Sequence, residues 1–316
     1  MMLRCIEFKP KHYIFQYTPN ESAPSDIDAS EYFDAVQDEY WEAWEQLQAE
    51  DISEQEKTMM AFSLDAVSQQ KLHVFCQLAP DDIDILLGAS EVAANVGAQI
   101  NFLRLAVEAG YQALPDDFNW NICKLPNSEE NELFLLAMSQ LAEAYLEIEA
   151  HWHQAEKLLL RLNKVCPESD LGTDQQLLRL YQTMGEWRKA QAVCKRNKGE
   201  HLVLFRYGQA LSHIMLDQQD QARKHLAAAV AAMPEAAEIL LRQPSEEELE
   251  AEYDAALEEM GADLEQFELE DEREWAGGET PLNRSRLAMV TYCQDCGHLW
   301  TEGRPAELLA ELALRR

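Results

Sequence analysis

The sequence predicts an all-α fold made of repeated helical hairpins, preceded by a short N-terminal extended or β arm. Three observations favour this fold: the composition, the helical spacing of the apolar residues, and an internal repeat. Proline and glycine are scarce, at 11 and 12 of 316 residues, and long runs favour the helix formers Ala, Leu, Glu and Gln. Only the first residues have the aromatic and β-branched content that is typical of strands.

The internal repeat lies between residues 132 and 236. The small residues Ala155, Ala190 and Ala222 are 35 and 32 residues apart, and each is followed four positions later by a larger apolar residue. This interval is close to the roughly 34 residues of a tetratricopeptide (TPR) helix–turn–helix unit. Small residues let the two helices of a unit approach closely, and a residue one turn later points the same way. The pattern predicts a TPR-like solenoid; a helical bundle with fortuitous alanine spacing is the alternative.

The N-terminal arm covers residues 1–29. Residues 3–8 and 13–17 are aromatic and β-branched, with a proline-containing break between them, which predicts a small hairpin or an extended arm packed on the array. Residues 18–29 have the composition of a linker.

The helical array is expected to span residues 30–242, with its clearest repeats at 132–236. A helix capped by Ser30 carries an aromatic stripe, which we interpret as packing between helices rather than as a ligand-binding surface. Pro80 and Pro115 are again 35 residues apart, so a divergent repeat is expected between them.

Six segments resemble a known family. They are 84–88 (DILLG), 105–114 (LAVEAGYQAL), 141–145 (LAEAY), 170–172 (DLG), 177–181 (LLRLY) and 205–211 (FRYGQAL). In this order they resemble the bacterial TPR proteins termed suppressor-of-tumorigenicity-7-like. These motifs serve packing, so the resemblance implies a helical-repeat fold and an adaptor role, with no catalytic residue to carry over. The sequence departs from the family pattern at 243–278, where a short connector is expected.

That departure is an acidic insertion. Between residues 246 and 274 there are fifteen acidic residues and a single basic one. Ser245 and Glu248 form a capping box that predicts an amphipathic helix, and Gly261 is expected to end it. Acidic residues interleaved with large apolar ones can engage a basic, hydrophobic partner; a solvated insertion without a partner is the alternative. Residues 279–316 are expected to form capping helices at the end of the array.

The formal net charge of −32 excludes general binding to DNA, RNA or anionic membranes, since those need a Lys/Arg surface. It leaves solubility, attraction to a basic partner, or imitation of nucleic acid. No apolar run is long enough for a membrane span, and no convincing signal peptide is present. Seven scattered cysteines do not form a disulfide framework, so a cytoplasmic protein is expected.

The sequence contains no motif that indicates an enzyme. Cys293 and Cys296 resemble half of a zinc ribbon, but a structural zinc needs four ligands and no second Cys-x-x-Cys exists in the sequence. We interpret them as buried helical cysteines. His151 and His153 are two apart, so they point to different sides of a helix. Nucleotide-binding, hydrolase and metalloprotease motifs are absent from the sequence, so no catalytic residue, cofactor or metal is expected.

The repeat phase predicts which residues line the inner, concave helices. These are Ser139, Glu143, Gln175, Arg179, Gln182 and either Tyr207 or Gln209. Only Arg179 is basic, which disfavours the clamp for acidic peptides that some TPR adaptors use and favours a neutral or basic ligand.

The sequence therefore predicts a cytoplasmic, non-enzymatic scaffold that binds a protein partner, neutral or basic. The partner-contact candidates are Glu143, Gln175, Arg179, Gln182 and Tyr207 on the concave face, with Phe267 and Trp275 from the insertion. The alternative function is an acidic inhibitor that imitates nucleic acid and occupies the basic cleft of a nuclease or DNA-binding protein.

Overall fold

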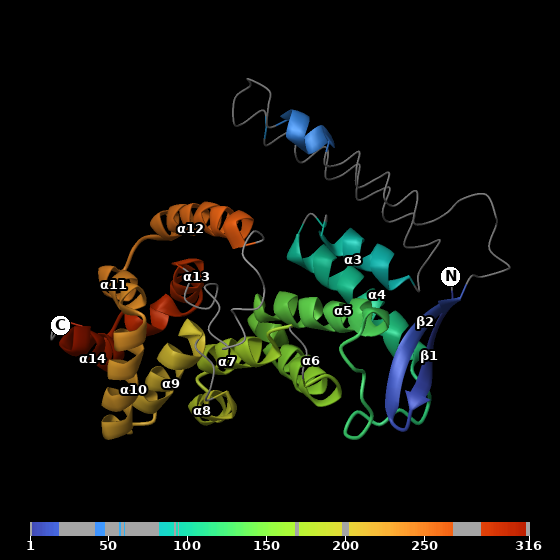
Figure 1. Ribbon diagram of the computed structural model, residues 1–316, viewed down its shortest axis with the longest axis horizontal. Helices are drawn as coiled ribbons and strands as arrows, with labels where there is room; N and C mark the ends of the chain where they lie inside the picture. Colours follow the sequence, from blue (N-terminus) through green and yellow to red (C-terminus); the bar gives the residue numbers. More distant parts are fainter. Residues whose placement is uncertain are drawn as a thin grey trace. The chain divides into compact units, whose positions relative to one another are not determined.

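A computed structural model, drawn in Figure 1, shows the arrangement of the chain. It describes residues 2–18, 42–47, 57, 60, 82–91, 93, 95–167, 171–197, 202–267 and 286–313. The described residues are mainly helical, with one two-stranded sheet, which confirms the helical fold class. The chain divides into two compact units, Met1–Thr173 and Asp174–Arg316, and the division falls within the predicted array. Thr18, predicted as the first linker residue, is the last residue of a strand. The rest of that linker (19–29), the cap at Ser30 and the acidic residues beyond 267 lie outside the described residues.

The N-terminal arm is a β-hairpin, as the sequence predicted. Strand β1 (Met2–Lys9) pairs antiparallel with β2 (His12–Thr18), with Leu3 opposite Tyr17 and Cys5 opposite Phe15. The side chains of Leu3, Tyr13 and Phe15 are buried. Alternation of buried and exposed residues along a strand is the mark of a sheet with one face on a core. The hairpin therefore packs on the first unit instead of extending from it.

Four α-helices follow the hairpin in the first unit. They are α3 (Ile83–Glu91), α4 (Val96–Ala113), α5 (Glu129–Leu146) and α6 (Trp152–Val165), with the short 3-10 helix η1 (Glu149–His151) before α6. Each helix packs against the next one along the chain. Asn95 caps α4, since its side-chain oxygen accepts a hydrogen bond from the Ala98 N–H at 3.0 Å. Gly110 allows the close approach of α4 and α5, because a Cβ there would lie 2.1 Å from the ring of Phe134.

The second unit begins with two further helix pairs. Helix α7 (Thr173–Thr183), whose first residue still belongs to the first unit, is followed by α8 (Trp187–Arg196), and α9 (Val203–Met215) is followed by α10 (Gln219–Ala232). The alanines that define the sequence repeat are buried between helices: Ala190 is 0% and Ala222 is 1% exposed, and Ala155 in the first unit is 0% exposed. The packing role that the sequence assigned to these alanines is confirmed.

Four longer helices and one 3-10 helix complete the second unit. They are α11 (Pro234–Arg242), α12 (Glu246–Phe267), α13 (Arg286–Cys296), η4 (Gly297–Trp300) and α14 (Gly303–Ala313). Pro234 both follows the end of α10 and occupies the first turn of α11, where the missing N–H costs nothing. Helix α12 continues through Gly261 to Phe267, so the predicted end at Gly261 is wrong. A mid-helix glycine costs only about 1 kcal/mol, which the flanking helix formers outweigh.

Candidate functional site

The inner-face residues predicted on α7 are covered by a later helix of the same unit. Arg179 makes an ion pair with Asp295 on α13, with 3.1 Å between Nη2 and Oδ1. Gln182 is 1% exposed, and its Oε1 lies 3.7 Å from the Cys296 Sγ on the same helix. Gln175, near the beginning of α7, is exposed. Helix α13 therefore occupies much of the surface on which the sequence predicted partner contacts.

Tyr207 on α9 belongs to the hydrophobic core. Its side chain is 0% exposed, and its hydroxyl donates a hydrogen bond to the Met233 carbonyl at 2.8 Å. Its ring centroid lies 5.7 Å from that of Tyr292 and 5.9 Å from that of Trp300. Trp300 Nε1 in turn donates to the Tyr292 hydroxyl at 2.9 Å, and burial raises the pKa of Tyr292 well above its ordinary value. The Tyr292 hydroxyl is therefore a neutral group of the core.

Two predicted partner contacts are therefore corrected. Both are core residues: Gln182 lies against Cys296 of α13, and Tyr207 packs against Tyr292 of α13 and Trp300 of η4, so neither presents a surface to a partner. Figure 1 shows α13 against the helices α9 and α11. No signal within residues 132–236 could have revealed this cover, since the covering helix is about a hundred residues further along the chain.

The remaining candidates are scattered. Ser139 on α5 is buried at 5% exposure, and Glu143, one turn later, is exposed. Gln209 on α9 is half-buried. Phe267 is the last residue of α12, its side chain lies outside the described part, and so does all of Trp275. Among the candidates whose side chains the structure describes, Arg179, Gln182 and Tyr207 each contact α13.

Cys293 and Cys296 are buried on α13, as the sequence predicted, at 4% and 1% exposure. Burial raises the pKa of each thiol to about 12, so both are protonated and poor nucleophiles at neutral pH. Within the part of the chain that the structure describes, no three His, Cys, Asp or Glu residues are arranged to hold a metal ion. Both cysteines serve packing.

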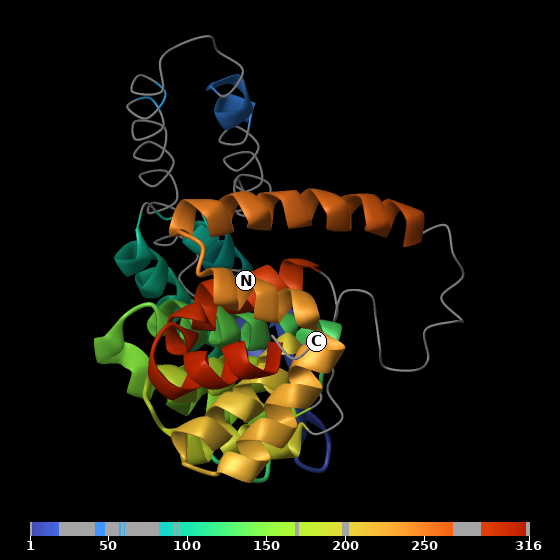
Figure 2. The ribbon, with the colours of Figure 1, turned by 90° about the vertical axis from the view of Figure 1, so that its left-hand side faces the viewer.

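Helix α12 is the most acidic described element, and it begins with the predicted capping box. The Ser245 N–H donates to Glu248 Oε2 at 2.8 Å, and the Glu248 N–H donates to Ser245 Oγ at 3.2 Å. Ala256 is 2% exposed, while Leu249 and Tyr253 are partly buried against the core of the second unit. These three residues recur at spacings of four and three, so they form the apolar side of the helix. Figure 2 shows α12 as the long orange helix.

The other side of α12 carries a row of carboxylates. Glu246, Glu250, Asp254 and Glu258 follow each other at intervals of four residues and are all exposed. Successive members are about 6 Å apart along the helix axis. Glu252 differs from them, because it pairs with Arg242 on α11 and lies 3.9 Å from Arg286 on α13. Two arginines thus hold α12 to its neighbours, and the exposed row faces solvent.

A groove of about 720 Å³ lies along the first two turns of α12. Its lining comes from α11, the turn after it, α12, α13 and η4, and includes Ile239, Leu240, Leu249, Cys293 and Gly297. This groove was not predicted from the sequence. Pro234 is suited to begin a helix, and the apolar pair Ile239 and Leu240 that follows it could have indicated a further helix with an apolar side.

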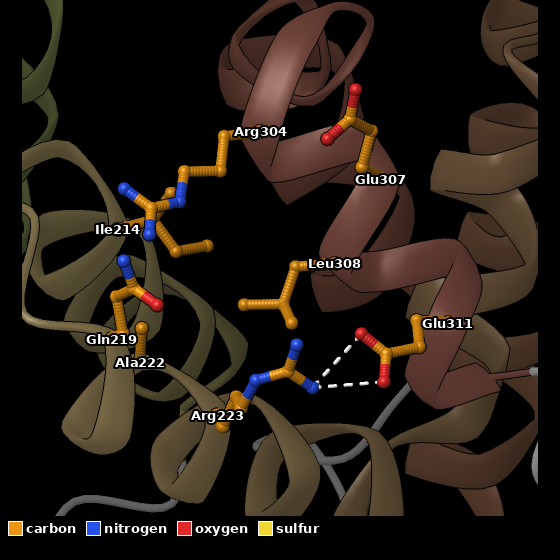
Figure 3. A pocket seen from close by; sticks show the side chains of 8 residues that line it. All are labelled: Ile214, Gln219, Ala222, Arg223, Arg304, Glu307, Leu308 and Glu311. Atoms are coloured by element: carbon orange, nitrogen blue, oxygen red, sulfur yellow. Dashed lines mark hydrogen bonds and ion pairs between the residues drawn. The ribbon is translucent and has the colours of Figure 1, made fainter.

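A second, smaller pocket of about 140 Å³ lies between α10 and α14. Figure 3 shows its apolar base, which includes Leu308, and the ion pair of Arg223 with Glu311 at 2.8 Å. Arg304 pairs with Asp217. Both arginines of this pocket are therefore engaged by carboxylates of the protein itself, and the acidic groove remains the candidate site.

Comparison with known proteins adds no relative: no family model, no curated protein and no solved structure matches the chain. The family resemblance therefore stays a prediction. Among the described helices, none has the length and apolar character that crossing a bilayer requires.

Proposed function

We propose that this protein is a non-enzymatic, TPR-like scaffold that binds a basic protein partner through the exposed face of α12. The observation that carries the proposal is the division of α12 into two sides. Leu249, Tyr253 and Ala256 hold the helix on the second unit, while the row from Glu246 to Glu258 is exposed. A cationic surface can reach that row without disturbing the core.

The packing of the helix pairs supports a TPR-like array. Short turns join the helices of the pairs α7–α8 and α9–α10, and the short helix η1 joins α5 to α6. The intervals of 35 and 32 residues between the buried alanines are close to that of a helix–turn–helix repeat. Such repeats each bury their apolar faces against their neighbours, and they commonly present an extended surface to a partner. The cover that α13 makes over Gln182 and Tyr207 moves the proposed partner surface from the inner helices to α12.

The carboxylate row itself favours a partner of opposite charge. Like charges four residues apart on a helix repel each other, and each such pair costs roughly 0.2–0.5 kcal/mol. The row contains three such pairs, formed by Glu246, Glu250, Asp254 and Glu258. A basic partner converts this repulsion into attraction, which also speeds association at low ionic strength.

Affinity capture from an extract of the source cells tests the proposal. The immobilised chain is compared with a variant that carries Glu246→Gln, Glu250→Gln, Asp254→Asn and Glu258→Gln. A matched control removes the same charge elsewhere, at the exposed residues Glu91, Glu108, Glu149 and Glu235, each changed to Gln. At low salt, we expect one or more basic proteins on the wild-type chain and on the control, and their loss from the α12 variant. Equal capture by all three chains, or none by the wild type, would refute the proposal.

The alternative is an inhibitor that imitates nucleic acid, and the regular row on α12 is the observation that favours it. The carboxylates of the row are about 6 Å apart along the helix axis. Phosphates of one DNA strand follow each other at about 3.4 Å, so every second phosphate is about 6.8 Å from the last. The two spacings agree approximately. The alternative predicts that the captured protein is a DNA- or RNA-binding protein, and that duplex DNA releases it. If DNA does not displace the captured protein, the scaffold function is favoured over the inhibitor.

A further inference from the structure

The groove beside α12 has the size and lining of a binding site. Its volume of about 720 Å³ falls within the roughly 300–1,000 Å³ of most ligand pockets. Ile239 and Leu240 on α11 and Cys293 on α13 give it an apolar base, each less than a tenth exposed. Leu249 on α12 is partly buried at its side. Apolar side chains of a ligand could therefore be buried here.

Two features of the backbone keep the groove open. Gly297, the first residue of η4, has no side chain, and a Cβ built there would lie 3.9 Å from Leu240 Cδ2. Gln243 adopts a left-handed conformation, with φ 51° and ψ 59°, where the chain leaves α11. Its side-chain amide donates to the Thr301 carbonyl at 3.2 Å, which ties this turn to the residue after η4. Helix α12 thus leaves α11 at a fixed turn, and the hollow lies beside it.

The edge of the groove that α12 forms is acidic, and the exposed His298 of η4 also lines the groove. Glu246 and Glu250 line it from α12, one turn apart, and both are exposed. The nearest arginine along the chain, Arg242, is engaged with Glu252. Within the described part of the chain, no cation pairs with Glu246 or Glu250. An apolar base with two carboxylates on its edge is complementary to a segment that carries apolar and cationic side chains together.

We propose that this groove is the docking site for a basic amphipathic helix of the partner protein. The inference rests on the proposed function and names the partner class of the same surface. Helix-in-groove recognition uses apolar residues at positions i, i+3 and i+4 of the bound helix. Here those residues contact Ile239, Leu240 and Leu249. Lysine or arginine side chains one turn away pair with Glu246 and Glu250, while an acidic segment or a nucleic acid is repelled.

The probe for this proposal is a fluorescein-labelled synthetic helix of leucine and lysine, with leucines at positions i, i+3 and i+4. Binding is measured by fluorescence anisotropy at low salt. Gly297→Leu places a large apolar side chain at the groove, at a position whose Cβ would lie 3.9 Å from Leu240 Cδ2. Glu246→Gln with Glu250→Gln removes the rim charge, and Glu235→Gln with Glu238→Gln is the control on the exposed face of α11. A second peptide, with glutamine in place of leucine, keeps the charge and loses the apolar face.

We expect Gly297→Leu to weaken binding at least about tenfold, and the rim variant to weaken it several-fold with a shallower salt dependence. The control should bind as the wild type does, and the glutamine peptide should bind poorly. If Gly297→Leu binds normally while the rim variant does not, the groove proposal fails and the acidic-surface function stands. If the wild type binds neither this peptide nor any basic protein, both fail.

A second measurement does not depend on the folding of a variant. Methyl NMR of the wild-type protein during peptide titration reports where the ligand lies. We expect the signals of Ile239, Leu240 and Leu249 to shift together and to saturate with the binding curve. Ile100 on α4, in the other unit, serves as the reference and should not shift. Shifts confined to residues outside the groove would overturn the proposal.

Discussion

Asn131 shows how much structure can depend on one residue. It is fully buried on α5, and its Oδ1 accepts from the Phe15 N–H at 3.1 Å. Its Nδ2 donates to the carbonyls of Tyr13 at 3.1 Å and Pro126 at 2.9 Å. One amide thus satisfies three backbone groups and attaches β2 to the first unit. The sequence contains no sign of this role, because both Tyr13 and Phe15 are more than a hundred residues away along the chain.

Replacing Asn131 with leucine leaves these three backbone groups buried without their partner. Each such group costs about 1–3 kcal/mol, so we expect a loss of about 3 kcal/mol or more in the free energy of unfolding. Urea unfolding and hydrogen exchange at the Phe15 amide check this. Asn121→Ala is the control: Asn121 is exposed and accepts only from Lys164 Nζ at 3.0 Å, so its loss should stay within about 0.5 kcal/mol. Equal stability of both variants would contradict the argument.

Residue-scale prediction of the site succeeded where local chemistry decides and failed where distant packing does. The capping box of Ser245 and Glu248 is a contact between residues three apart, and it was predictable in full. The burial of Tyr207 depends on Tyr292 and Trp300. Periodicity assigns Tyr207 to one side of α9, but nothing in a repeat specifies what covers that side.

At the scale of elements, helix α12 has a well-capped N-terminus and a row of carboxylates that repel each other along the turns that follow. The capping box and the glutamates of the first turn favour its N-terminus, and the carboxylate row opposes its continuation. We expect Ser245→Ala to destabilise the helix by about 1 kcal/mol, and Asp254→Asn to stabilise it by a few tenths of that. Hydrogen exchange of the α12 amides measures both. A helix whose protection is unchanged by Ser245→Ala would show that packing, not capping, determines its stability.

The contact between α9 and α10 contains a stacked pair of histidines. The ring centroids of His213 and His225 are 4.9 Å apart, with an interplanar angle of 6°. Burial lowers the pKa of His225, and the neighbouring His213 and Lys224 lower it further. His213 Nδ1 lies 2.6 Å from Gln218 Oε1, and the adjoining Gln191 accepts from Lys195 Nζ on α8. The neighbours that lower the pKa of His225 are thus a lysine and a second histidine, and both oppose a positive charge on its ring.

This arrangement makes stability depend on pH. Because the folded pKa of His225 is below the unfolded value of about 6.5, the unfolded chain binds the proton more readily. The contribution of His225 is present above about pH 6.5 and is lost as the pH falls below it. We expect the free energy of unfolding to fall between about pH 7.5 and pH 5.5, and to fall less in His225→Gln. His153→Gln is the control, since the His153 side chain is 84% exposed. Parallel pH profiles of wild type and His225→Gln would count against this account.

Element boundaries were predictable to the extent that end signals are local. The hairpin, α4 and the alternation of helices through α10 follow from periodicity, capping and proline. Helix α11 was not predicted, because a proline such as Pro234 is suited both to follow one helix and to begin the next. The length of α12 was missed because Gly261 was given more weight than the helix formers on both sides of it. Pro234 and Gly261 are each compatible with the end of a helix and with a helical position. The surrounding packing decides which of the two occurs.

At the scale of the whole molecule, the chain carries 58 acidic and 26 basic residues. Exposed charges of one sign repel each other in the compact state, and salt screens that repulsion. Ion pairs such as Arg196 with Asp174 act in the opposite direction, but exposed pairs contribute only about 0–1 kcal/mol each. With an excess of 32 negative charges, repulsion should dominate the salt dependence of folding.

We therefore expect sodium chloride to act in opposite directions on folding and on binding. Between about 20 mM and about 500 mM, the urea midpoint of the free protein should rise, because the Debye length falls to a few ångströms and self-repulsion weakens. Over the same range, the affinity for the leucine–lysine peptide should fall, because the attraction to Glu246 and Glu250 is screened as well. Sucrose, which stabilises by exclusion without screening, should raise the midpoint and leave the affinity nearly unchanged. If salt lowers the midpoint, paired charges outweigh the net charge; if salt leaves the peptide affinity unchanged, the partner surface is not the acidic face of α12.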